Sequence, residues 1–226
     1  MSRLLATSLS LASLAVFATP SPLRATVAGK GSPVVLIPGL ACSGSVWRET
    51  AAHLAERHEV HVLTLPGFAG VAPVRGPFYP GLMNPDATPA LMEPRARAVR
   101  ERLEASGAQL GANLKKTLTE QIRDEHLRDA VVEEAATSSP EVMADAVYGL
   151  LTTDLREKVG AIGAPVLLIA AANGQPMEQV TQLYSAQVAR APHATAVVHP
   201  TSKHFIMLDE PAFLLTTIDG FLGEAR

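Results

Sequence analysis

The stretch from Pro33 to Gly70 constrains the fold of this 226-residue chain most strongly. Two apolar runs, Pro33–Ile37 and Glu59–Leu65, lack polar alternation and predict buried strands of a parallel sheet. Between them, a Pro-Gly turn with a small-residue loop leads into Val46–Arg57, whose amphipathic pattern predicts a helix. A strand, a helix and a strand in so few residues form a βαβ unit, which predicts an α/β fold.

Two groups of motifs in the sequence resemble the α/β-hydrolase family, of the esterase- or lipase-like kind with a helical cap. The first group follows the Pro33–Ile37 strand and comprises Pro38-Gly39, Trp47 and Leu65-Pro66-Gly67-Phe68. The second group comprises the predicted strands Pro165–Ala171 and Ala194–His199, Ser202-Lys203-His204-Phe205 and Leu208-Asp209-Glu210-Pro211. The resemblance implies a mostly parallel sheet flanked by helices, and hydrolysis of a carboxylic ester or similar acyl substrate by a Ser-His-acid mechanism.

The segment that should carry the nucleophile is missing from this pattern. In the family, the catalytic serine lies in a strand-to-helix elbow of the form Gly-x-Ser-x-Gly. None of the 16 glycines in the sequence has a serine two residues later. Between Gly70 and Phe78, roughly 60 residues of two βα units are absent by comparison with the family. We therefore expect a sheet shortened by the loss of central strands, and hydrolysis that is impaired or inactive.

The loss of central strands leaves two possible arrangements of the sheet. Either Val34–Ile37 pairs directly with Val166–Ala171, or each strand exposes an unpaired edge. The resemblance further divides the chain into an N-terminal part of the core at 26–77, a helical cap at 78–151 and a C-terminal part of the core at 152–226. Within this division the patterns predict a short edge strand at 24–28 and cap helices at 90–106, 108–118, 119–137 and 140–151.

Residues 1–18 have the form of a secretory signal peptide. A short positive start precedes the apolar run Leu4–Phe17, which is too short to span a bilayer comfortably, and Val16-Phe17-Ala18 ends as a cleavage site does. Cleavage is expected after Ala18 or, as an alternative, as late as Ala25; an uncleaved anchor is the other alternative. We expect an exported protein, periplasmic or secreted, without a stable membrane span once the signal is cleaved.

Charge and cysteine content narrow the range of partners. The net charge of −3, with both signs scattered, gives no basic patch for nucleic acid. Cys42 is the single cysteine, which excludes an intramolecular disulfide and a multi-cysteine metal site. No cofactor or metal is implied. The expected partner is a small apolar acyl or aromatic molecule, and the oligomeric state is not determined by the sequence.

His204 is the strongest candidate for a catalytic residue. The resemblance places it at the position of the general base, and an imidazole titrates near neutral pH. The acid that would orient the imidazole is less well defined. Asp154 is a weak candidate, with helix capping as its alternative role. Asn173 stands at the usual position of the acid, but an amide does not stabilise an imidazolium as a carboxylate does.

The loop after the first predicted strand contains the remaining candidates. The resemblance places the oxyanion hole at Gly39 and Leu40, with the Leu40 backbone N–H as one donor; the second donor normally follows the nucleophile. A strand-to-helix turn without catalytic role is the alternative. Ser43, Ser45 and Cys42 are possible relocated nucleophiles, although packing of a tight loop explains them more simply.

Three functional hypotheses remain open at this level. The chain is an esterase-type hydrolase with impaired chemistry, a non-catalytic protein that binds a small molecule in a retained pocket, or a truncated product without function.

Overall fold

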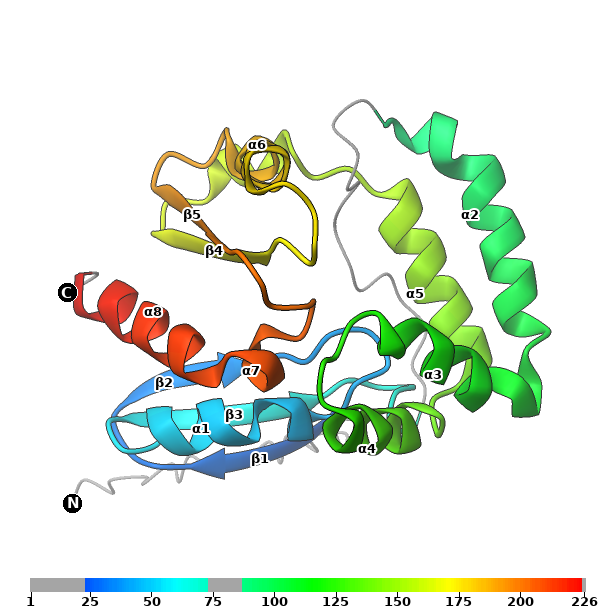
Figure 1. Cartoon of the computed structure of the whole chain (residues 1–226), viewed down its shortest axis with the longest axis horizontal. Coiled ribbons are helices and arrows are strands. Elements are labelled where there is room, and N and C mark those ends of the chain that lie inside the picture. Colours follow the sequence, from blue (N-terminus) through cyan, green and yellow to red (C-terminus); the bar gives the residue numbers. More distant parts are fainter. Residues whose placement is uncertain (1–22, 73–86, 225–226) are drawn as a thin grey trace, which may run out of the picture.

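The computed structural model describes residues 23–72 and 87–224, and these residues form two small sheets surrounded by helices (Figure 1). The strands are β1 (Arg24–Ala28), β2 (Ser32–Leu36), β3 (His58–Thr64), β4 (Val166–Ala171) and β5 (Ala194–His199). The predicted signal peptide and the first residues of the predicted cap, 78–86, lie outside the described residues.

The first sheet has the order β1-β3-β2. β2 pairs with β3 in parallel, as the βαβ pattern predicts, and β1 adds an antiparallel edge strand with the predicted bounds. The connection between β2 and β3 is a 3-10 helix, η1 (Gly44–Trp47), followed by α1 (Arg48–Leu54). Thr50 and Leu54 lie four residues apart on one side of α1 and are both buried.

The second sheet consists of β4 and β5, which are parallel and in register from Val166 and Ala194 onwards. Helix α6 (Met177–Val188) connects the two strands and packs against them. Ala170 and Val180 form the centre of this small core. After β5 the chain continues through α7 (Ile206–Asp209), which the sequence pattern did not predict, into α8 (Pro211–Glu224).

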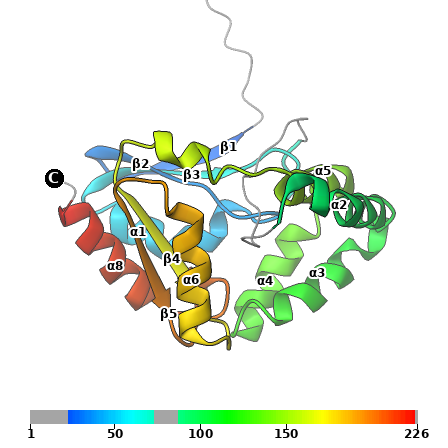
Figure 2. The same ribbon diagram turned by 90° about the horizontal axis from the view of Figure 1, so that it is seen from above.

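The two sheets do not join. β2 and β4 are both edge strands within the described residues, so the second of the two arrangements is the one adopted. The prediction that β2 is a buried strand is wrong: Val35 is 54% exposed, and Val27, which lies on the same face of the sheet on β1, is 58% exposed, because no element covers this face. Figure 1 shows α8 lying along the gap between the sheets, and Figure 2 shows the same parts from above.

Four helices between β3 and β4 form a separate layer beside the sheets (Figure 1). They are α2 (Pro89–Glu104), α3 (Leu110–Thr119), which follows the short 3-10 helix η2 (Gly107–Gln109), α4 (Glu125–Ala135) and α5 (Pro140–Thr152). The predicted helix at 119–137 begins only at Glu125, because the Asp124 side chain accepts a hydrogen bond from the Leu127 N–H and caps α4. A further 3-10 helix, η3 (Lys158–Ala161), leads towards β4. None of the helices in the described ranges is long and apolar enough to cross a membrane.

The Leu-Pro-Gly-Phe motif joins the helical layer to the first sheet. Phe68 is fully buried against Ala135 and Met143, which belong to α4 and α5. The Gly67 carbonyl accepts a hydrogen bond of 2.8 Å from the Ser139 N–H. Gly67 has φ of +83°, and an added Cβ would lie 2.5 Å from the Val142 side chain, so both backbone conformation and space require glycine here.

Candidate functional site

His204 faces a cavity of about 410 Å³ in the gap between the two sheets. Val34 and Leu36 of β2 form one wall, and Leu167 and Ile169 of β4 form the other. The remaining lining comes from η1, α1, the segment around α7, and α8, namely Trp47, Thr50, Leu54, Ile206, Met207, Leu214, Ile218, Phe221 and Leu222. The lining is therefore apolar except for the imidazole, the Trp47 indole N–H and the Thr50 hydroxyl, and it contains no serine or cysteine.

The surroundings of the His204 imidazole disfavour its charged form. Although the residue as a whole is exposed, the apolar surroundings of the ring remove water from it and lower the pKa of His204 below its ordinary value. Its ring meets that of Phe205 edge-on, with centroids 5.5 Å apart. No hydrogen bond joins the imidazole to another residue of the described part of the chain, so a proton acceptor is present but no acid orients it.

Asp209 fixes the backbone of the His204 loop. One carboxylate oxygen accepts a hydrogen bond of 2.9 Å from the Lys203 N–H, and the other accepts one of 2.9 Å from the Arg123 N–H. In addition, the Phe205 N–H donates to the Gln121 carbonyl at 3.2 Å. The connection between α3 and α4 therefore holds the two residues that flank His204. The sequence signal for this role was the Leu208–Pro211 motif, which gave no indication of the partner Arg123.

Side-chain contacts strengthen the same junction. The Arg123 guanidinium donates to the Thr201 carbonyl at 3.1 Å and to the Glu210 carboxylate at 2.9 Å. The Lys203 ammonium donates to the Thr119 carbonyl at 2.8 Å. These groups connect the helical layer to the loop that follows β5, so the position of His204 depends on both parts of the molecule.

The two acid candidates make other contacts. The Asp154 carboxylate binds the Arg156 guanidinium at 2.6 and 2.9 Å and accepts the Arg156 N–H, and these hydrogen bonds lower the pKa of Asp154. Asn173 follows β4 with φ of +47°, and its backbone N–H donates to the Ser202 carbonyl. Neither side chain forms a hydrogen bond with His204. The identity of the acid that would orient the His204 imidazole therefore stays a prediction.

The predicted oxyanion loop is a tight turn. The Cys42 N–H donates to the Gly39 carbonyl at 3.1 Å, and Ala41 takes the positive φ of 63° that this turn requires. Among the described residues, the Leu40 N–H has no acceptor, so it remains available as a donor to a ligand oxygen. The geometry is compatible with both the oxyanion and the simple-turn interpretation, and the assignment stays a prediction.

Ser43 and Ser45 lie next to a carboxylate rather than an imidazole. The Ser45 hydroxyl donates to Glu134 of α4 at 2.7 Å, and the Ser43 hydroxyl contacts the same oxygen. Neither serine contacts His204. Activation of a serine hydroxyl as a nucleophile is typically the task of an imidazole, and neither serine contacts one, so these contacts do not make a nucleophile. The contact with Glu134 has no local signal in the sequence, because about 90 residues separate the partners.

Cys42 is a packing residue and not a nucleophile. It is 3% exposed in a cluster with Val46 and Phe205. Burial and the nearby Glu134 raise the pKa of Cys42 to about 12, which is the opposite of the shift that a reactive thiol needs.

We expect the native protein at pH 8 to react with a chromogenic disulfide reagent more than 100-fold more slowly than the urea-unfolded chain does, since about three pKa units separate the thiol of the native protein from that of the unfolded chain. Equal rates would contradict this burial.

No group of three histidine, cysteine or acidic side chains within residues 23–72 and 87–224 is arranged to hold a metal ion. The site at the gap between β2 and β4 therefore contains an imidazole and an apolar cavity. Leu40 packs against the cluster around Phe68 and does not line this cavity.

No protein-family model matches the sequence. Over 42 residues the chain is 43% identical to the pimeloyl-[acyl-carrier protein] methyl ester esterase of Vibrio cholerae; this match spans 19% of the chain and 16% of the length of that relative. Three solved structures resemble the whole architecture: a thermophilic esterase from Thermogutta terrifontis, a bromoperoxidase from Bacillus anthracis and an enol-lactonase from Burkholderia xenovorans.

The esterase gives a TM-score of 0.72 at 16% identity over 90% of this chain and 93% of its own. The bromoperoxidase gives a TM-score of 0.73 at 16% identity, over 89% of this chain and 95% of its own. The enol-lactonase gives a TM-score of 0.69 at 15% identity, over 89% of this chain and 96% of its own. The chain thus has the α/β-hydrolase fold, with helices flanking a mostly parallel sheet of few strands. The structural similarity establishes the fold, whereas sequence identities this low do not establish the activity, which has to be inferred from the site.

Proposed function

We propose that this chain is an esterase-type α/β-hydrolase-fold protein whose cavity beside His204 takes a small apolar acyl or aromatic molecule, and whose own hydrolysis is impaired. The observation that carries the proposal is the position of His204. It faces a 410 Å³ apolar cavity that contains no serine or cysteine. In the ancestral reaction a serine would attack the acyl carbon, the imidazole would take its proton, and backbone N–H groups would stabilise the oxyanion.

The open edges of β2 and β4 support the idea that a nucleophile-bearing segment is absent. Both strands end their sheets at this cavity, where Val34 and Leu36 of β2 face Leu167 and Ile169 of β4. Whole strand–helix units inserted between β2 and β4 would cover these edges and would place a strand-to-helix elbow near His204. The resemblance to a curated methyl ester esterase and to a solved esterase is consistent with acyl chemistry.

The walls of the cavity indicate the kind of ligand that it takes. Apart from His204 and Thr50, the lining residues are aliphatic or aromatic. A small molecule with an apolar acyl chain or an aromatic ring suits such walls.

We expect that any esterase turnover by the folded chain does not depend on His204. The folded chain, incubated with p-nitrophenyl butyrate, should hydrolyse it no faster than the variant His204→Ala, and incubation with a fluorophosphonate should leave its intact mass unchanged. The urea-unfolded chain serves as the control for non-specific phosphonylation. A single stoichiometric adduct on the folded chain, together with turnover lost in His204→Ala, would overturn the proposal of impaired chemistry, and peptide mapping would then identify the serine.

Binding without turnover is the second candidate function, and the cavity volume favours it. A cavity of 410 Å³ lies within the range of about 300–1,000 Å³ that small-molecule sites occupy. Aliphatic and aromatic methyl ketones, tested as non-hydrolysable acyl analogues, should raise the melting temperature of the folded chain. A variant that fills the cavity, such as Leu167→Trp, should abolish this shift, whereas no shift with any ketone would contradict a ligand site.

A further inference from the structure

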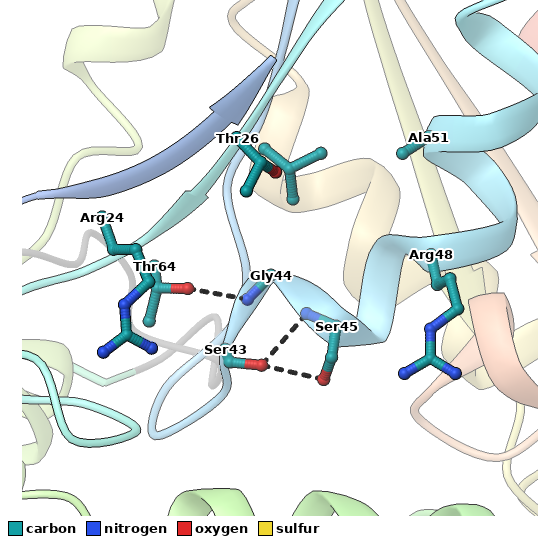
Figure 3. A pocket seen from close by; sticks show the side chains of 9 residues that line it. Arg24, Thr26, Ser43, Gly44, Ser45, Arg48, Ala51 and Thr64 are labelled. Atoms are coloured by element: carbon teal, nitrogen blue, oxygen red, sulfur yellow. Dashed lines mark hydrogen bonds between the residues drawn. The ribbon is translucent and has the colours of Figure 1, made fainter. Parts of the chain in front are cut away.

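A second cavity, of about 390 Å³, borders a different face of α1 from the His204 cavity, and Figure 3 shows the residues that line it. Helix α1 contributes Arg48 and Ala51 to this groove, whereas Thr50 and Leu54 face the His204 cavity. The two cavities share no lining residue. A ligand in the second groove would therefore occupy a site independent of the acyl cavity proposed above.

Strands β1 and β3 form the floor of the groove. Arg24 pairs with Thr64 across the two strands, and Thr26 pairs with Val62, so these four side chains lie on one face of the sheet. The Ser43–Ser45 loop borders the groove, and the Gly44 N–H donates to the Thr64 hydroxyl oxygen at 2.9 Å. Thr64 therefore uses its oxygen as an acceptor and keeps its hydroxyl proton for another partner.

The groove carries two positive charges and no negative one in its lining. Neither Arg24 nor Arg48 forms an ion pair or a side-chain hydrogen bond with any residue that the structure describes. This distinguishes them from seven of the eleven arginines within residues 23–72 and 87–224, which are paired with carboxylates: Arg57, Arg97, Arg100, Arg123, Arg128, Arg156 and Arg190. Figure 3 shows the two arginines on opposite sides of the Ser43–Ser45 loop, with their guanidinium groups directed the same way.

We propose that this groove binds a short α,ω-dicarboxylate, with one carboxylate on Arg24 and the other on Arg48. A guanidinium presents parallel donors that match a carboxylate, and two such groups on opposite sides of the loop suit an elongated ligand better than a single compact anion. Thr26, Val62 and Ala51 also line this groove, and the Thr26 hydroxyl has no partner among the described residues.

The charge of Glu134 affects the affinity of the groove for a dicarboxylate. Its carboxylate binds the Ser43 and Ser45 hydroxyls and uses their donors, so these serines do not contribute donors to an anion. The negative charge lies next to the groove and repels an anionic ligand. Replacement by glutamine keeps the shape and removes this repulsion, so Glu134→Gln is expected to tighten dicarboxylate binding, whereas it would weaken binding of a cation.

The test is a titration of the full chain with adipate, followed through backbone amide chemical shifts at low salt. The Gly44 and Thr64 amides should shift, and hexanoate, which has the same length and one carboxylate, should bind about three- to fivefold more weakly. Arg24→Ala and Arg48→Ala should each weaken adipate to the level of hexanoate. Arg102→Ala removes another unpaired arginine, on α2, and is the matched control that should leave adipate binding unchanged.

Several outcomes would overturn the proposal. Equal affinities for adipate and hexanoate would show that only one arginine acts, and tighter binding of inorganic phosphate than of adipate would show a compact-anion site. Shifts at Trp47 instead of Gly44 would assign adipate to the His204 cavity. If an alanine variant loses its native amide spectrum, Arg24→Lys and Arg48→Lys keep the charge and the fold; both are expected to bind adipate more tightly than hexanoate, and failure to do so contradicts the site.

Discussion

Replacing Phe68 by alanine is expected to lower the free energy of unfolding by about 3–5 kcal/mol, the range found when a fully buried aromatic side chain is truncated. Phe68 has no exposed surface and packs against Ala135, Met143 and Ala146, so the substitution leaves a cavity where the helical layer meets the first sheet. Urea denaturation followed by far-ultraviolet circular dichroism measures the change.

The control for this prediction is Leu91→Ala. Leu91 lies on α2 and is 66% exposed, so its truncation should change the free energy of unfolding by no more than about 0.5 kcal/mol. A loss below about 1 kcal/mol for Phe68→Ala would show that the Leu-Pro-Gly-Phe motif does not join the two parts of the molecule as described.

Replacing Asp209 by alanine is the second prediction with a large effect. The substitution removes the acceptor of the Lys203 and Arg123 N–H groups, and we expect it to lower the free energy of unfolding by about 1–3 kcal/mol. It should also loosen the loop on both sides of His204, which broadens or shifts the His204 imidazole resonances. Denaturation and imidazole NMR spectra of the same variant measure the two effects.

Two controls separate this role from a general loss of surface charge. Asp209→Asn keeps one carbonyl oxygen as an acceptor, so its stability should lie between those of the native chain and Asp209→Ala. Asp129→Ala removes an exposed carboxylate that pairs with Lys115, and it should cost no more than about 1 kcal/mol without affecting the His204 spectrum. If Asp129→Ala and Asp209→Ala change the imidazole resonances equally, Asp209 does not position the His204 loop.

The strands and the capped helices were predictable because their signals are local. The bounds of β1 and the β4 range Val166–Ala171 agree with the sequence prediction, and Ser139 caps α5 with proline at the first helical position. Each of these signals lies within one element and depends on side-chain periodicity or on a cap. The helix at 119–137 was placed too early because its boundary depends on the capping geometry of Asp124.

The candidate site was predictable only in part, because some of its contacts have no local signal in the sequence. The motif around His204 placed the imidazole after the last strand, and the small-residue loop placed Leu40 before α1. The carboxylate that holds Ser43 and Ser45, and the junction between Asp209 and Arg123, join residues about 90 positions apart and have no pattern along the chain.

The sequence alone predicted that this chain builds α/β-hydrolase elements, and it shows that no Gly-x-Ser-x-Gly is present. The assignment of His204 to the position of the general base stays a prediction from the resemblance. Only the tertiary structure decided how the elements assemble. An apolar run such as Pro33–Ile37 predicts burial, yet the sheet face that contains Val35 is uncovered, and β2 remains an open edge. The physical reason is that the pairing of strands and the covering of a sheet face each involve two segments, so neither segment encodes them alone.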